Sequence, residues 1–153
     1  METGDLAPDF TLADDQGVER TLSDFLSSGP VVLFFYPAAM TSGCTAESCH
    51  FRDLAAEFAE VGAQRVGISP DAVEKQRAFS AANSFDYPLL SDVDGGVAKQ
   101  FGVWRKLIPL HTKRQTFVIG TDRRVLDVIK SELNFTAHAD RALKLLRDRK
   151  AAA

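Results

Sequence analysis

Residues 31–49 read VVLFFYPAAMTSGCTAESC, and this stretch decides the fold of the chain. Val31–Tyr36 is continuously apolar, which is typical of a strand covered on both faces of a sheet. A loop of small and polar residues, Pro37–Gly43, follows, and Cys44 then opens an amphipathic helix that we expect to end near Gly62. This unit predicts a cysteine at the carboxyl end of a strand, the edge where open α/β sheets bind ligands.

Strands and helices alternate on both sides of this unit. Strand patterns occupy Phe10–Leu12, Glu19–Leu22, Arg65–Ser69, Tyr87–Leu90, Gln115–Ile119 and Val125–Lys130. Helical patterns occupy Leu22–Leu26, a helix capped by Asp71 and running to about Ala82, Gly95–Phe101, and roughly Ala137–Arg149. The alternation predicts an α/β three-layer sandwich, in which a central mixed sheet has helices on both faces and an N-terminal β-hairpin beside it.

Composition limits the classes of function. The chain has 153 residues, which indicates a single domain over residues 1–153. Its 18 Lys and Arg against 21 Asp and Glu give a net charge of −3, which argues against nucleic acid as a partner. No apolar run approaches the roughly 20 residues of a membrane span, and the acidic N-terminus has no signal-peptide pattern. We therefore expect a cytoplasmic protein with no membrane partner, and there a pair of cysteines is more often catalytic, redox-active or metal-binding than structural.

Cys44 is a candidate nucleophile because of its expected position. A helix N-terminus has unpaired backbone N–H groups and a partial positive charge, which favour a thiolate over a thiol. An ordinary cysteine with a pKa of about 8.5 is only about 3% thiolate at pH 7, so such a position changes its reactivity greatly. The alternative interpretation is a buried cysteine that acts as a small hydrophobic residue.

Cys49 lies five residues after Cys44. In an intact helix this spacing separates the two Cα atoms by about 8.6 Å. A disulfide needs Cα atoms within about 7 Å, so the two cysteines can pair only if the first turns of the helix unwind. Oxidation of the pair would therefore be coupled to local unfolding.

Other chemistries fit the sequence less well. The C-x₄-C spacing is not the C-x-x-C of a thioredoxin-type site. A zinc site built from the two cysteines with His50 and either His111 or His138 matches no familiar ligand spacing, and we read these last two histidines as structural. There is no G-x-S-x-G elbow and no phosphate-binding glycine loop. We predict neither a metal nor a cofactor.

The segment 34–49 resembles the active-site segment of the peroxiredoxins, and most of all that of the peroxiredoxin Q (bacterioferritin comigratory protein) branch. The family pattern P-x-x-x-[TS]-x-x-C is met by Pro37, Thr41 and Cys44, and a second cysteine at the position of Cys49 is particular to that branch. Further likenesses lie, in the family's order, at residues 7–12, 87–92 and 114–119.

The resemblance implies a thioredoxin-like fold and the reduction of hydroperoxides. Cys44 would be the peroxidatic cysteine, which becomes a sulfenic acid, and Cys49 the resolving cysteine, which forms an intramolecular disulfide with it. Thr41 would hydrogen-bond the peroxide, Arg114 would support the thiolate and the departing oxygen, and Pro37 would shield the intermediate. Thioredoxin or a similar dithiol would restore the enzyme.

Each of these residues also has a simpler interpretation. Arg114 alone would be read as a solvated cation at the start of a strand, Thr41 as a helix N-cap, and Pro37 as the end of a strand. Glu47 matches a glutamate common in the family, yet it could equally be an interaction partner of the helix dipole. The segment Trp104–Lys113 does not align with the family, although it leads directly to Arg114.

Three functional hypotheses follow from these observations. The leading one is a thiol peroxidase that uses both cysteines. The alternatives are a thiol–disulfide oxidoreductase of thioredoxin-like fold and a redox-sensing interaction module without sustained turnover. The acidic surface is compatible with a monomer or a weak homodimer.

Overall fold

The computed structural model of the protein describes residues 1–106 and 112–152. Its strands are β1 (Thr11–Ala13), β2 (Glu19–Thr21), β3 (Val31–Phe35), β4 (Gln64–Ser69), β5 (Leu89–Ser91), β6 (Gln115–Ile119) and β7 (Val125–Lys130). Its helices are α1 (Leu22–Leu26), α2 (Ser42–Asp53), α3 (Ala55–Glu60), α4 (Val73–Asn83), α5 (Gly96–Gln100) and α6 (Ala137–Ala152).

Five strands form a mixed central sheet in the order β5-β4-β3-β6-β7, and β1 and β2 form a separate antiparallel hairpin. The central strand β3 runs parallel to β4 and antiparallel to β6. In the register of β3 and β6, Phe35 is paired with Gln115. The end of β3 and the start of β6 therefore lie at the same edge of the sheet, which is the edge where α2 begins.

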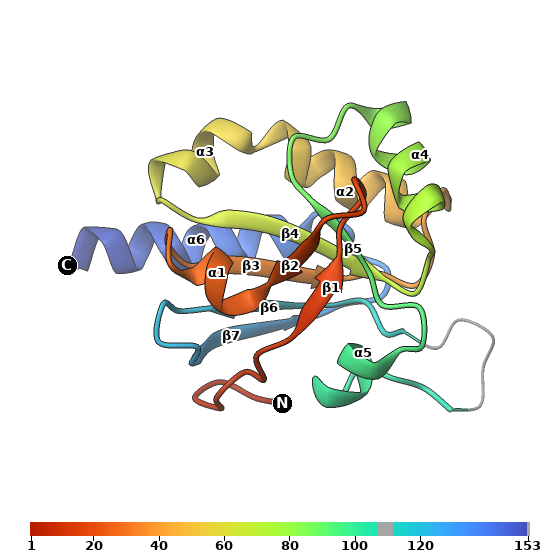
Figure 1. The fold of residues 1–153 in the computed structure, drawn as a ribbon. Helices are drawn as coiled ribbons and strands as arrows, with labels where there is room; N and C mark the ends of the chain where they lie inside the picture. The colour runs from red at the N-terminus through yellow and green to blue at the C-terminus, as the bar shows by residue number, and fades with distance from the viewer. Residues whose placement is uncertain (107–111, 153) are drawn as a thin grey trace.

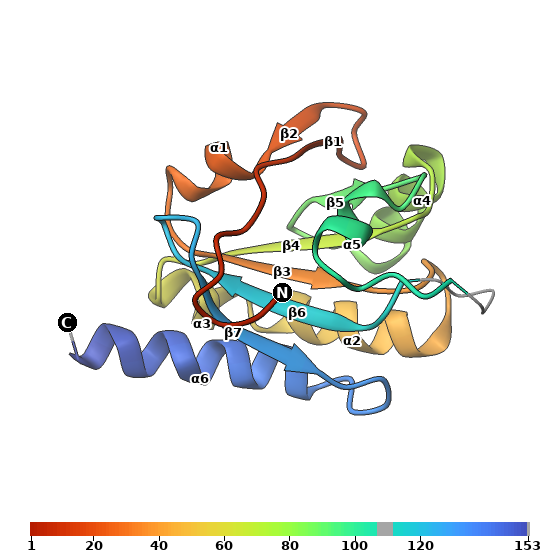
Figure 2. The same cartoon turned by 90° about the horizontal axis from the view of Figure 1, so that it is seen from below.

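The sheet lies between two layers, with the hairpin, α1 and α5 on one face and α2, α3 and α6 on the other (Figures 1 and 2). Alternate residues of β3 point to opposite faces, as the pleat requires. Val31, Leu33 and Phe35 belong to a core shared with the hairpin, α1 and α5. Val32 and Phe34 belong to a second core shared with α2, α3, α4 and α6. All five β3 residues are fully buried, which explains the continuous apolar run in the sequence.

The predicted α/β three-layer sandwich, with its mixed sheet and N-terminal hairpin, is confirmed. The expected strand at Tyr87–Leu90 is shifted, because β5 begins only at Leu89. The prediction that Asp71 caps α4 is wrong, since the N-cap is Ala72 and no side chain caps the helix there. The Asp71 carboxylate instead accepts hydrogen bonds from the Ala39 backbone N–H and the Ser69 hydroxyl, both at the edge near α2.

The single helix expected from Cys44 to Gly62 is also wrong. It begins two residues earlier, at Ser42, and Leu54 divides it into α2 and α3. The Phe51 carbonyl, which would receive the next helical hydrogen bond in a continuous helix, accepts one from Arg65 Nη1 of β4 at 2.8 Å. This tertiary contact has no signature in the local sequence pattern. Within the described part of the chain, no helix has both the length and the apolar character to cross a lipid bilayer.

Candidate active site

Cys44 lies in the first turn of α2, as the sequence predicts. The helix begins at Ser42 with Thr41 as its N-cap, so the backbone N–H groups of the first turn surround the thiol-bearing residue. The side chain is nearly closed off from solvent, with an exposed fraction of 1%. A negative charge on Sγ would therefore depend on the few polar groups around it rather than on bulk water.

Arg114 is the main one of these groups. It precedes β6 directly, and the pairing of Phe35 with Gln115 brings it to the end of β3 beside α2. Its Nη2 atom donates a hydrogen bond to Cys44 Sγ at 3.2 Å, and the residue is only 6% exposed. The interpretation of Arg114 as a solvated cation is therefore wrong, because its guanidinium is buried against the thiol.

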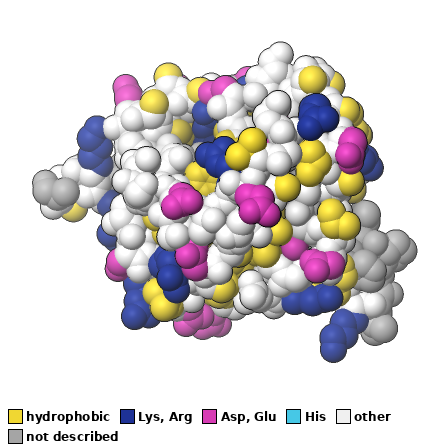
Figure 3. Space-filling view, in the orientation of Figure 1, with side chains coloured by type: hydrophobic (Ala, Val, Ile, Leu, Met, Phe, Trp, Pro, Cys, Tyr) yellow, Lys and Arg dark blue, Asp and Glu magenta, His cyan; other side chains and the backbone are white. Residues whose placement is uncertain are grey.

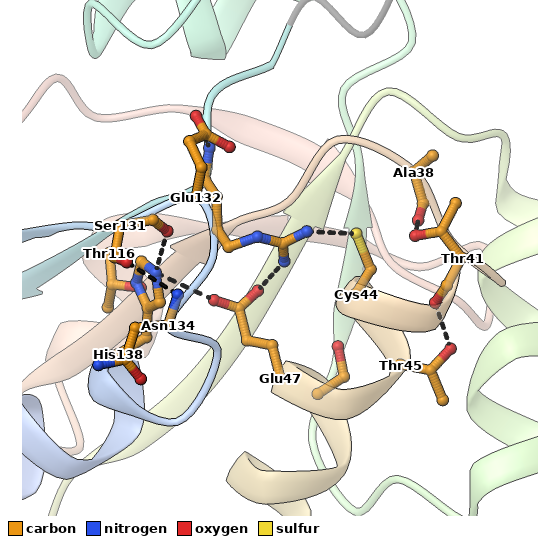
Figure 4. A network of polar contacts seen from close by, with 12 residues as sticks. Ala38, Thr41, Cys44, Thr45, Glu47, Thr116, Ser131, Glu132, Asn134 and His138 are labelled. Carbon is orange, nitrogen blue, oxygen red and sulfur yellow. Dashed lines mark hydrogen bonds and ion pairs between the residues drawn. The ribbon is translucent and has the colours of Figure 1, made fainter.

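Glu47 holds the other side of the same guanidinium (Figure 4). It lies one helical turn after Cys44 and is fully buried, and its Oε1 accepts a hydrogen bond from Arg114 Nη1 at 2.9 Å. Burial raises the pKa of this carboxyl to about 8, and the charge of Arg114 only partly opposes that rise. Glu47 is thus a buried partner of Arg114, which the sequence left undecided against a role at the helix dipole.

His138, in the first turn of α6, lies behind Glu47. Its ring is fully buried, and its Nε2 lies 3.6 Å from Glu47 Oε2. Nε2 also lies 2.8 Å from the Ser131 carbonyl oxygen, and Nδ1 lies 2.8 Å from Thr116 Oγ1. Burial lowers the pKa of this histidine to about 4, so the ring is neutral at physiological pH.

The segment between β7 and α6 covers Arg114. The Phe135 ring stacks on the guanidinium, whose carbon lies 4.9 Å from the ring centroid. A side chain at Gly43 would collide with this ring, since a Cβ atom there would lie 2.8 Å from Phe135 Cζ. Glu132 accepts a hydrogen bond from the Arg114 backbone N–H at 3.3 Å and forms an ion pair with Arg105. Arg114 is therefore fixed at both its backbone and its guanidinium.

Thr41 and Pro37 lie in the segment that connects β3 to α2. Pro37 is buried two residues after the end of β3. Thr41 is exposed beside Cys44, and its hydroxyl donates to the Ala38 carbonyl at 2.8 Å, while its own carbonyl accepts from the Thr45 hydroxyl at 2.7 Å (Figure 4). Thr41 is the N-cap residue of α2, as its simpler interpretation expects, although its hydroxyl makes no capping hydrogen bond. The lone pairs of its oxygen remain available to a hydrogen-bond donor.

Cys49 lies further along the intact α2 and is partly buried. Both cysteines are free thiols, in agreement with the helical geometry that keeps them from pairing. The Cys49 thiol donates to Asn83 Oδ1 of α4, with a sulfur–oxygen distance of 3.6 Å. Among the residues that the structure describes, no group of three or more His, Cys, Asp or Glu side chains could hold a metal ion. His111, considered as a metal ligand above, lies outside the described residues.

Sequence reasoning missed part of this site. It read His138 as a structural residue at a helix start and assigned no role to Phe135 or Asn83. The three-residue spacing of Cys44 and Glu47 is a usable signal, because residues three apart share one face of a helix. The contacts of His138, Phe135 and Asn83 depend on how elements distant in the chain pack together, and no local sequence pattern predicts them.

Comparisons with known proteins agree with this geometry. The AhpC/TSA family matches residues 3–128 of the chain. The chain is 39% identical over 147 residues to the chloroplastic peroxiredoxin Q of Sedum lineare, covering 96% of this chain and 78% of that one. It superimposes on the crystal structure of the peroxidoxin BcpB from Mycobacterium tuberculosis with a TM-score of 0.93 and 63% identity, over 97% of each chain.

A third comparison concerns a variant protein. The crystal structure of a cysteine-to-serine mutant of PrxQ from Xylella fastidiosa superimposes with a TM-score of 0.89 and 29% identity, over 98% of each chain. These likenesses confirm the thioredoxin-like fold that the sequence resemblance implied. The chain belongs to the AhpC/TSA family, as a peroxiredoxin similar to the peroxiredoxin Q proteins.

Proposed function

We propose that this peroxiredoxin, a thiol-dependent peroxidase, reduces hydroperoxides with Cys44 as the attacking thiolate and Cys49 as the resolving thiol. The observation that carries the proposal is the hydrogen bond of 3.2 Å from Arg114 Nη2 to a buried Cys44 Sγ at a helix N-terminus. A guanidinium and aligned backbone N–H groups both favour negative charge on sulfur. A thiolate is also the form of cysteine that reacts with a peroxide.

In the first step, the Cys44 thiolate attacks the terminal oxygen of the peroxide. The S–O bond forms while the O–O bond breaks, which leaves a sulfenic acid on Cys44 and an alkoxide or hydroxide that takes up a proton. Negative charge therefore moves from sulfur to the leaving oxygen. Arg114 already contacts the sulfur, so its N–H groups are well placed to stabilise this charge as it develops, and the Thr41 hydroxyl would orient the peroxide.

In the second step, Cys49 attacks the sulfenic sulfur of Cys44. A disulfide forms and one molecule of water leaves, carrying the hydroxyl of the sulfenic acid and the proton of the thiol. The intact α2 keeps the two sulfurs apart, so its first turns must unwind before this reaction. A thioredoxin-type dithiol then reduces the disulfide and is itself oxidised.

The proposal extends to partners and organisation. The net charge of −3 supports the expectation that nucleic acid is not a partner, and on the face of the molecule in Figure 3 Lys and Arg side chains are scattered among Asp and Glu side chains. We propose a single peroxiredoxin domain over residues 1–153, acting as a monomer or weak homodimer with thioredoxin itself as the preferred dithiol. We propose that the protein acts in a reducing compartment such as the cytoplasm, because each catalytic cycle must return both cysteines to free thiols.

The test is hydrogen peroxide consumption with a thioredoxin system, comparing wild type, Cys44→Ser and Cys49→Ser. We expect sustained turnover in the wild type and none in Cys44→Ser. Cys49→Ser should consume about one equivalent and then stall, because its sulfenic acid has no resolving partner. Turnover that survives Cys44→Ser would overturn the site, and a single oxidation without turnover in the wild type would favour the redox-sensing alternative.

A further inference from the structure

We propose that His138 is a positioning residue of this site, which holds Glu47 and the segment 131–136 so that the Arg114 guanidinium reaches Cys44 Sγ. The inference rests on the proposed peroxidase function and adds a residue to it. His138 touches neither the sulfur nor the expected substrate position, so it acts only through other groups. Two separate routes lead from its ring to Arg114.

The hydrogen bonds of His138 fix the state of its ring. A carbonyl oxygen can only accept, so Nε2 must carry the hydrogen that it shares with the Ser131 carbonyl at 2.8 Å. The neutral ring then has a bare Nδ1, which accepts a hydrogen bond from the Thr116 hydroxyl at 2.8 Å. Both nitrogens are occupied, and the ring is fully buried, so its orientation is fixed.

The first route runs through Glu47. Its Oε1 is bound to Arg114, whereas Oε2 is buried without a hydrogen-bond partner among the described residues. The polar atom facing that oxygen is His138 Nε2, at 3.6 Å. The ring, which its hydrogen bonds to Ser131 and Thr116 hold in place, lies against that side of the carboxyl group and limits its movement away from the guanidinium (Figure 4).

The second route runs through the backbone. The bond from Nε2 to the Ser131 carbonyl ties the end of β7 to the first turn of α6. The residues between these two points include Glu132, which accepts from the Arg114 backbone, and Phe135, whose ring covers the guanidinium. Loss of the hydrogen bond between His138 and Ser131 would therefore free the segment 131–136, which holds the backbone of Arg114 and covers its guanidinium.

Both routes act on the guanidinium, so a defect at His138 should affect the peroxide reaction more than the intrinsic reactivity of the thiol. Cleavage of the O–O bond needs Arg114 in place for the charge on the leaving oxygen. Alkylation by iodoacetamide, measured at a pH where the thiol is fully ionised, needs no such stabilisation. The ratio of the two rate constants therefore separates positioning of Arg114 from a general loss of structure.

The experiment compares wild type, His138→Leu and His138→Gln, with Cys44 oxidation by hydrogen peroxide measured by competition with horseradish peroxidase. The Gln amide lies where Nε2 does and can still donate to Ser131, whereas Leu fills the space without donating. We expect His138→Leu to lower the peroxide rate constant about 10- to 100-fold while alkylation changes less than about threefold. His138→Gln should recover most of the peroxide rate.

His50 provides the matched control, since it is a partly exposed histidine on α2 that pairs with Asp140 rather than with Arg114. His50→Leu should leave the rate of Cys44 oxidation within about threefold of wild type, as expected of a surface substitution. If His138→Leu does not fold, His138→Asn carries the test, because it keeps an acceptor for Thr116 but has no donor within reach of Ser131.

A His138→Leu or His138→Asn protein with a wild-type peroxide rate would overturn the inference. So would a variant in which the peroxide and alkylation rates fall by the same factor. These outcomes differ from failure of the proposed function, which would appear as absent turnover in the wild type or as turnover that survives Cys44→Ser.

Discussion

Arg114 Nη2 lies 3.2 Å from Cys44 Sγ, although 70 residues separate the two in the chain. The same guanidinium binds Glu47 through its other terminal nitrogen, at 2.9 Å. A planar fork with fixed N–H directions can serve both partners at once, and a lysine ammonium on a flexible stem cannot do so in the same geometry. The site therefore depends on the shape of the arginine as well as on its charge.

Arg114→Lys should lower the rate constant of Cys44 oxidation by hydrogen peroxide about 10- to 100-fold, because the charge remains but the fork is lost. Arg114→Leu should lower it further, since it removes both. Competition kinetics against a heme peroxidase measures both variants. A lysine variant as fast as wild type would show that positive charge alone suffices.

Glu47 should make stability depend on pH. Its pKa is about 8 in the folded protein and ordinary in the unfolded chain, so the folded state keeps a proton that the unfolded state has lost. The contribution of this carboxyl to stability is therefore fully present below about pH 4.5 and is lost as the pH rises through about 8. In a Cys44→Ser background, urea unfolding between pH 6.5 and 8 should show a steeper loss for Glu47 than for Glu47→Gln. If the unfolding free energies of the two proteins changed with pH in parallel, Glu47 would not be a protonated carboxyl in the folded protein.

His138 should make the protein less stable as the pH falls, which is the opposite of the effect of Glu47. Its pKa falls to about 4 in the folded protein, whereas the unfolded chain takes up the proton near pH 6.5. The contribution of this histidine to stability is present above pH 6.5 and is lost as the pH falls from 6.5 to about 4. Urea unfolding with His138 and with His138→Gln across this range should show the protein with His138 losing more. The comparison is made in a Glu47→Gln background, because His138 contacts Glu47 and its replacement would otherwise change the titration of that carboxyl; equal profiles would then mean that the ring is not buried neutral.

Gly43→Ala should damage activity more than stability. A Cβ atom at this position would lie 2.8 Å from Phe135 Cζ and 3.4 Å from Arg114 Nη2, so the ring must move away from the guanidinium. Alanine is favoured over glycine in a helix by about 1 kcal/mol, which offsets part of the strain. We expect a slower peroxide reaction with little change in melting temperature. The double variant Gly43→Ala/Phe135→Leu should recover activity if the collision with the ring is the cause.

Asn83→Ala should accelerate disulfide formation. The Asn83 side chain donates to the Phe79 carbonyl at 3.0 Å, which directs its oxygen toward the Cys49 thiol. Its removal weakens the contact between α2 and α4 that holds Cys49 in the folded helix. Mass spectrometry of samples quenched after one equivalent of peroxide should show faster appearance of the disulfide, with the oxidation of Cys44 unchanged. Slower disulfide formation would mean that Asn83 assists the reaction rather than restraining it.

The sequence predicted the parts of this molecule that local patterns determine. The apolar run Val31–Tyr36 and the following cysteine indicated the central strand and the candidate nucleophile, because a fully buried strand leaves an unbroken apolar signal. The resemblance to the peroxiredoxins added Arg114 and Cys49. The register of β6 against β3 then explains why Arg114 lies beside the thiol.

The remaining features depend on tertiary contacts. Leu54 interrupts the cysteine helix where Arg65 binds the Phe51 carbonyl, and helix propensity does not report such a contact. Asp71 has the residue type and position of a cap, yet its carboxylate binds the Ala39 backbone instead. His138 stands at a helix start as expected, but its contact with Glu47 depends on the packing of α6 behind α2.

The pairing of β6 with β3 also determines when the thiol becomes reactive during synthesis of the chain. A ribosome delivers Cys44 and its helix early, but β6 and the histidine of α6 emerge only in the last third of the sequence. Contacts between residues so far apart form late in folding, because the intervening chain must first be ordered. In the proposed mechanism, a nascent chain would expose a cysteine that lacks its contact with Arg114, and reactivity toward oxidants would be acquired together with the completed sheet. In the proposed mechanism, the attacking thiol is therefore not activated until the contacts that support it have formed.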